Sequence, residues 1–213
     1  MKGVKFDDFH TYLDFGLLLS EKTIGSPSAK TESINVPGAD GELDLTEYFG
    51  YVNYKNRKLS FTFKTIAPMN EFLNVYSTVQ NALNGKKMKI ILDDDPYFYY
   101  VGRVQVNEWK SDGRVGTIVI DCNCEPYKYK LNKTIITDSI VSSAAIIYDN
   151  LRKPTVPTIK TTAAMTVVFG TVTTVLNSAG EYTIPEIIFR EGKNTITYTG
   201  TGMVTLEYQE GGL

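Results

Sequence analysis

Alternating apolar and polar residues recur along the first part of the chain and predict β-strands. Leu59, Phe61 and Phe63 alternate with polar residues, which is typical of a strand with one buried face. The same alternation, or a short apolar run, predicts further strands at residues 15–19, 88–92, 97–106 and 115–124.

A turn signal at residues 37–41 predicts a β-hairpin. The sequence Pro-Gly-Ala-Asp-Gly stands there between two alternating segments, which together run from Ser33 to Leu45. Asp and Gly accept a positive φ, as tight hairpin turns require. We therefore expect two short antiparallel strands around this turn.

One segment has helical periodicity. Pro68 suits its first turn, and Asn84-Gly85 provides a stop signal beside Lys86 and Lys87, which suit the negative end of the helix dipole. About sixteen residues of helix are marginal alone, so this helix is expected to lie on a sheet. Its apolar stripe consists of Phe72, Val75, Tyr76, Val79 and Leu83.

The last third of the chain differs in character. It has no helical pattern, few charges and many Thr, Val and Ile residues, and its turn signals include 177–180 and 200–202. Short strands between such turns predict a compact antiparallel sandwich, with 187–189, 195–198 and 204–208 as its clearest strands. We predict two domains, residues 1–133 and 134–213.

Composition narrows the classes of function. The 213 residues have a formal net charge of −2, which argues against an electrostatic nucleic-acid binder. No apolar run approaches the ~20 residues that cross a bilayer, and the first ten residues are polar. We expect neither a signal peptide nor a membrane span, and a protein that is made in a cytosol and meets its partners in solution.

The sequence offers no set of residues for catalysis. His10 is the sole histidine, no serine lies in a G-x-S-x-G motif, and no phosphate-binding glycine motif is present. Cys122 and Cys124 are two apart in a predicted strand, where their spacing disfavours a disulfide, and no further Cys or His accompanies them as a metal would need. We therefore predict no enzyme, no cofactor and no metal.

Three consecutive acids, Asp93, Asp94 and Asp95, precede Pro96 in a predicted turn. Carboxylates can serve a glycosidase or a cation. Consecutive residues on a turn point in different directions, however, and the spacing of a Ca²⁺ loop is lacking. A solvated or interface turn is the favoured interpretation, with a weak cation site as the alternative.

Two aromatic runs have apolar residues on both faces. A surface strand normally has one polar face, so such runs are either plain core or meet another chain. A sugar site is a third possibility for the second domain, which has Tyr148, Tyr182, Tyr198 and Tyr208 but no Trp. The candidate interface residues of the two runs are Tyr48, Phe49, Tyr51, Tyr54, Tyr97, Phe98, Tyr99 and Tyr100.

Several segments, in order along nearly the whole chain, resemble the distal tail proteins (Dit) of long-tailed phages and prophages of Gram-positive bacteria. Each segment alone is weak evidence for the resemblance, but their common order along the chain is specific to this family. They are Phe9–Leu17, Ile34–Thr46, Asn84–Lys86, Leu92–Pro96, Tyr99–Arg103, Cys122–Tyr129, Ile184–Glu186 and Glu191–Gly202.

The resemblance implies a mainly β fold. The N-terminal domain would be a β-sandwich with one helix and an extended hairpin, and the C-terminal domain a galectin-like β-sandwich. Six copies would form a ring at the baseplate, the tail tip of the virion, where the ring acts as a structural hub for host adsorption. As a separate hypothesis from their charge, Asp93, Asp94 and Asp95 would line the channel of such a ring, where like charge would let DNA pass without sticking.

The implied partners are the chain itself, the tail tube protein, the tail-associated lysin or spike, and receptor-binding or other baseplate proteins. Synthesis would take place in the cytoplasm of the host bacterium. The alternative function is a carbohydrate-binding β-sandwich module that acts in cell-surface recognition.

Overall fold

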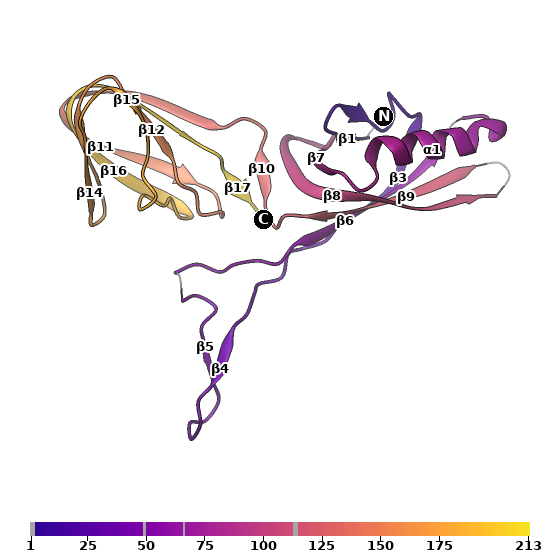
Figure 1. The fold of residues 1–213 in the computed structure, drawn as a ribbon, viewed down its shortest axis with the longest axis horizontal. Coiled ribbons are helices and arrows are strands. Elements are labelled where there is room, and N and C mark those ends of the chain that lie inside the picture. The colour runs from indigo at the N-terminus through magenta and orange to yellow at the C-terminus, as the bar shows by residue number, and fades with distance from the viewer. Residues whose placement is uncertain (1–2, 49, 66, 113–114) are drawn as a thin grey trace. The chain divides into compact units, whose positions relative to one another are not determined.

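A computed structural model describes residues 3–48, 50–65, 67–112 and 115–213. The chain divides into two compact units, residues 1–128 with Leu213 and residues 129–212 (Figure 1). The sequence placed the boundary at residues 133 and 134, just before the first long strand of the second unit. Each unit is described by itself.

The first unit is built on an antiparallel sheet with the strand order β2-β1-β7-β8-β9-β6-β3. Phe6 on β1 and Phe61 on β6 make an edge-to-face ring contact with centroids 6.2 Å apart, although three strands separate them in the sheet. The sheet therefore curls over itself and encloses a core. Its strands are β1 (Val4–Phe6), β2 (Phe9–His10), β3 (Leu17–Ile24), β6 (Arg57–Thr65), β7 (Lys87–Leu92), β8 (Asp95–Ser111) and β9 (Gly116–Cys124).

Helix α1 (Phe72–Leu83) covers this core after a short 3-10 turn, η1 (Met69–Glu71). The predicted stripe is confirmed, because Phe72, Val79 and Leu83 are buried. The helix has twelve residues rather than about sixteen, since its first turn is a 3-10 turn. Beyond its C-terminus, Lys86 Nζ donates to the carbonyl oxygen of Ala82 at 2.6 Å, which satisfies a carbonyl that the helix leaves unpaired.

An arm, residues 31–54, leaves the first unit between β3 and β6 (Figure 1). The predicted hairpin is confirmed by β4 (Ser33–Asn35) and β5 (Glu42–Asp44), which pair around a turn where Gly38 and Gly41 have positive φ. None of the described residues of the arm is buried.

The second unit consists of strands that share one core. Strand β16 pairs with β11 along its whole length, and on its other edge it pairs first with β13 and then with β12. Its bend lies at Gly200 and Gly202, whose φ angles are 146° and 154°. The strands are β11 (Thr134–Asn150), β12 (Thr158–Thr161), β13 (Met165–Phe169), β14 (Val172–Leu176), β15 (Gly180–Thr183) and β16 (Gly192–Tyr208). The short strands β10 (Lys128–Lys130) and β17 (Gly211–Gly212) pair with each other and not with this sheet.

The prediction of a mainly β chain with one helix is confirmed, but two details of the second unit were wrong. Residues 200–202 bend the continuous strand β16 and do not separate two strands. Residues 187–189 form an irregular segment in which Ile187 and Phe189 are buried, Ile188 is exposed, and Phe189 makes a bridge to Thr155. Apolar content alone does not distinguish such a segment from a strand. The sequence Ser111-Asp112-Gly113 also predicts a turn, and its last residue lies outside the described residues.

Gly102→Ala should destabilise the first unit. A Cβ at this position would lie 2.4 Å from Sγ of Cys124 and 2.9 Å from the carbonyl oxygen of Asn123, so the strands β8 and β9 would have to move apart. Overpacking of this kind costs about 1–3 kcal/mol. Urea denaturation of the variant and the wild type measures the difference, and an unchanged midpoint would contradict the tight packing at this site.

The two thiols should be unreactive in the folded chain. Both cysteines are buried and free, and burial raises the pKa of Cys124 to about 12 and that of Cys122 further. The thiolate, which is the reactive form, is therefore scarce at pH 8. Dithionitrobenzoate should label neither thiol in the native protein and both in denaturant. Rapid native labelling would show that this part of β9 opens.

Candidate assembly surfaces

The three consecutive acids occupy the turn between β7 and β8 and the first position of β8, and each of them has a partner. Asp93 accepts a hydrogen bond from the backbone N–H of Gly3 at 2.6 Å. Asp94 forms an ion pair with Lys22, and Asp95 one with Lys128 at 2.7 Å. The turn thus ties three other segments of the first unit to this corner of the sheet.

His10 belongs to the same corner. Its Nδ1 accepts from the backbone N–H groups of Tyr12 and Leu13, each at 3.2 Å. Because Nδ1 accepts, the ring proton lies on Nε2, which contacts the carboxylate of Asp93 at 3.2 Å. Every polar atom of this ring is used to hold the N-terminal segment, and a Cβ at Gly3 would collide with the ring at 2.6 Å.

The aromatic run that follows this turn divides between surface and core. Tyr97 is 78% exposed and Tyr100 is 5% exposed. The ring of Phe98 lies 4.3 Å from Nζ of Lys128, and the ring of Tyr99 lies 5.1 Å from Nζ of Lys89. Tyr97 is therefore the residue of this run that is available to another chain.

The aromatic run in the arm and after it lies largely at the surface. Tyr48 is 76% exposed, Tyr51 and Tyr54 are half-buried, and Tyr54 packs edge-to-face against Tyr127 with ring centroids 6.0 Å apart. Phe49, the remaining residue predicted for this interface, lies outside the described residues.

The tyrosines of the second unit bear on the alternative of a sugar site. Tyr148, Tyr198 and Tyr208 are buried in the core, and the hydroxyl groups of Tyr148 and Tyr198 lie 3.2 Å apart. Burial keeps these three rings from stacking on a sugar. Tyr182, which is half-buried, donates to the carbonyl oxygen of Ser178 at 2.9 Å.

The arm is acidic. Between residues 31 and 54 the sequence has five carboxylates and no Lys, Arg or His. None of the five forms an ion pair with the described part of the chain. Hydrogen bonds from Thr46 hold the pKa of Asp44 below its ordinary value. The carboxylates are Glu32, Asp40, Glu42, Asp44 and Glu47.

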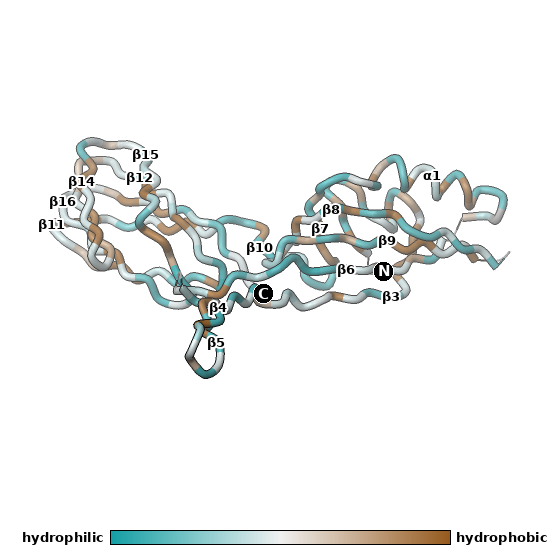
Figure 2. Tube along the Cα trace, turned by 60° about the horizontal axis from the view of Figure 1, so that its bottom comes forward, coloured by the Kyte–Doolittle hydropathy of each residue, from teal (hydrophilic) through white to brown (hydrophobic). Residues whose placement is uncertain are grey.

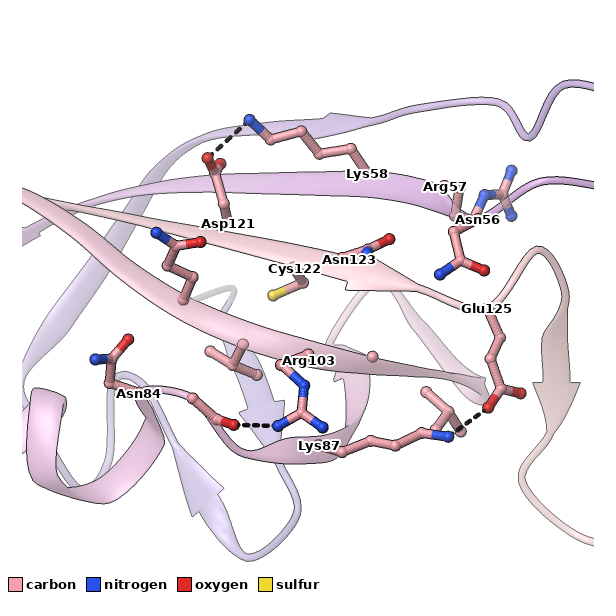
Figure 3. A pocket seen from close by; sticks show the side chains of 15 residues that line it. Asn56, Arg57, Lys58, Asn84, Lys87, Arg103, Asp121, Cys122, Asn123 and Glu125 are labelled. Carbon is pink, nitrogen blue, oxygen red and sulfur yellow. Dashed lines mark hydrogen bonds and ion pairs between the residues drawn. The ribbon is translucent and has the colours of Figure 1, made fainter.

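The face of the sheet that points away from the core contains a hollow of about 820 Å³ (Figure 3). Three cations lie in one line across its strands, and Lys87 on β7 is the direct register partner of Arg103 on β8. Asn123 on β9 is in turn the partner of both Arg103 and Lys58. We call Lys87, Arg103 and Lys58 the cationic row.

The members of the cationic row differ in their partners. Lys87 pairs with Glu125 at 2.8 Å, and Lys58 pairs with Asp121 at 2.7 Å. Arg103 donates to the carbonyl oxygen of Gly85 at 2.5 Å and forms no ion pair with any described carboxylate. It is the middle charge of the row, and it is the one without a counter-ion.

Asp121 accepts hydrogen bonds from several side chains on the neighbouring part of this face. Burial acts to raise the pKa of Asp121, but hydrogen bonds from Lys58, Ser60 and Asn107 outweigh burial, and the pKa lies below its ordinary value. Ser60 Oγ donates at 2.6 Å and Asn107 Nδ2 at 2.7 Å. This carboxylate is therefore ionised and fully occupied within the chain.

Sequence reasoning did not find the cationic row. Its members lie on three strands and are far apart in the sequence, and only the register of β7, β8, β9 and β6 brings them together. Within the described ranges, no three or more His, Cys, Asp or Glu side chains gather as a metal site would need. Among the same residues, no helix is long and apolar enough to span a membrane.

Comparison with known proteins finds a match in structure but none in sequence. No known family model matches the chain, and no curated protein matches it in sequence. Its structure is similar to the crystal structure of the Dit protein (gp 19.1) of SPP1, described as a paradigm of the hub adsorption apparatus in phages that infect Gram-positive bacteria. The TM-score is 0.70 at 13% identity, over 98% of this chain and 99% of that one. The chain therefore has the β-sandwich fold of that hub protein.

Proposed function

We propose that the chain is a structural subunit of a bacteriophage tail tip, where it forms the hub of the adsorption apparatus. The observation that carries this proposal is the likeness in fold to a hub protein over nearly the full length of both chains. A likeness that included only one sandwich would suit many functions, whereas here the likeness covers 98% of this chain and 99% of that one.

Six copies would form a ring between the tail tube and the tail-associated lysin or spike. Each subunit would use two different patches, since a head-to-tail contact whose rotation closes produces a ring. The second unit, galectin-like in this proposal, would contact receptor-binding or other baseplate proteins, and DNA would pass through the channel. Each contact between copies is expected to bury more than ~1,000 Å².

The surfaces of the first unit support assembly. Tyr48 and Tyr97 are large aromatic residues with most of their surface exposed, which is typical of contacts that another chain covers. The proposal includes no catalytic role, in agreement with the structural use of His10 and the burial of both thiols. The channel-lining role of Asp93, Asp94 and Asp95 stays a prediction. Asp94 and Asp95 form ion pairs with lysines, and these pairs reduce the negative charge that would repel DNA.

The proposed function is tested by native mass spectrometry and negative-stain microscopy of the full chain over a range of concentrations. A species of six chains of 23.8 kDa each, seen as six-fold rings, is the expected result. A chain that stays monomeric at every concentration, and that also fails to assemble with tail tubes, would overturn it.

The double variant Tyr51→Asp/Tyr54→Asp should assemble less well than the wild type. Two buried charges in an interface cost several kcal/mol, so the ring should dissociate at concentrations about a hundredfold higher or more. The matched control is Val175→Asp, an exposed apolar residue of the second unit. Circular dichroism establishes that each variant is folded, and unchanged assembly of a folded double variant would remove both tyrosines from the interface.

A further inference from the structure

We infer that the open edge of β11 binds an extended, basic strand of a partner protein beside Asp138. The inference rests on the proposed function for the choice of partner, and it adds the place on the second unit, the mode of binding and the chemistry of the bound segment. It is argued from three features: a long strand edge without a neighbour, exposed aliphatic residues along that strand, and a buried carboxylate oxygen without a hydrogen-bond partner.

Strand β11 has a single neighbouring strand in the described chain. Its 17 residues pair with β16 from end to end, and no other described strand pairs with it. Every second residue of such an edge strand points its N–H and C=O groups away from the sheet. The strands at the other edges of the unit, β14 and β15, have only five and four residues, and short edge strands are what proteins favour. β11 therefore offers a long ladder of unpaired backbone groups.

The sequence of β11 lacks the usual protection of an edge strand. Lysine, proline and bulges keep edge strands from pairing with other chains. Residues 134–150 contain no lysine, arginine or proline, their register with β16 has no shift, and Figure 2 shows few strongly hydrophilic positions along the strand. Ile135, Val141 and Ile147 are 61%, 76% and 57% exposed. Exposed aliphatic residues beside unpaired backbone groups are typical of a surface that another strand covers.

Asp138 lies in the middle of the first half of this edge, residues 134–141, which ends at Ser142 with a φ of 72°. Strand alternation places Asp138 on the same face as Ile140, which is 1% exposed. The Oδ2 atom of Asp138 is buried and has no hydrogen-bond partner among the described residues. A buried oxygen of this kind destabilises the chain until a donor reaches it.

Asp138 also determines which strand fits. An inward-pointing charge at an edge opposes pairing with an apolar strand, because the charge would lose its water without gaining a partner. The same charge favours a strand that brings a cation to it. The only other charge of β11 is Asp149, so the strand has two acids and no base. A basic residue beside Asp138, with aliphatic residues beside Ile136 and Ile140, is therefore the complementary pattern.

The partner is a different protein and not a second copy. Neighbouring copies in the proposed ring meet through two different patches, whereas pairing of β11 with β11 would join the same patch on both. The acidic arm of a second copy has five carboxylates and no cation, so Asp138 would repel it. The other free edges of the second unit, β14 and β15, contain no cation either. A basic strand of another tail-tip protein meets none of these objections.

Peptide binding to the full chain tests the inference. The probe is the fluorescein-labelled peptide KTVTKTVTK, whose central lysine can meet Asp138 and whose valines can meet Ile136 and Ile140. One matched peptide, KTVTETVTK, reverses the central charge, and another has the sequence of the probe with N-methyl groups throughout, which removes the backbone donors. Fluorescence anisotropy should show that each change weakens binding about tenfold or more. Failure of the probe to bind, or equal binding of the N-methylated peptide, would overturn the inference.

Variants of the chain locate the bound peptide. Asp138→Lys should prefer the glutamate peptide, and Asp138→Asn, which keeps the shape of the side chain, should bind the two peptides about equally. The matched control is Glu186→Lys, which reverses an exposed charge of the same unit and should keep the preference for lysine. Circular dichroism establishes that each variant is folded, and Asp138→Asn alone decides the matter where Asp138→Lys does not fold. An unchanged preference for lysine in folded Asp138→Asn would contradict the assigned place.

The two proposals can fail separately. Six-fold rings of a chain that does not bind the probe would leave the hub function standing and remove the inference. A chain that is monomeric at every concentration, with an edge that selects lysine, would support the docking surface and contradict the ring. A dimer that the probe dissociates would show a second copy at β11 and overturn the choice of partner.

Discussion

The structure of the first unit depends on one constraint, which is that its antiparallel sheet buries only one of its two faces. The curled strands and α1 cover the inner face, where Leu59, Phe61 and Ile120 are fully buried. The outer face must then be polar to remain in water. That face presents the cationic row and the hollow above it, so the packing of the core determines which residues are left for partners.

The arm, like the outer face of the sheet, lies outside the core of the first unit. A segment that leaves the sheet between β3 and β6 without a core of its own adds nothing to the stability of the isolated subunit. Its exposed aliphatic residues and its single sign of charge are features of a segment that is ordered by contact.

The sequence predicted the local features well, because they depend on near neighbours. The alternation around Phe61, the stripe of α1 and the Asp-Gly turn of the arm are all local patterns, and the structure confirms them. The irregular segment 187–189 and the continuous strand through Gly200 were misread, since strand pairing depends on distant residues. The cationic row could not be predicted at all, because its residues meet only through the register of four strands.

The central claim is that copies of this chain hold one another through the first unit. Cryo-electron microscopy of the assembled protein tests this claim most directly. The account predicts a closed ring in which the first units of neighbouring copies lie against one another. An assembly held together by the second units alone would contradict it.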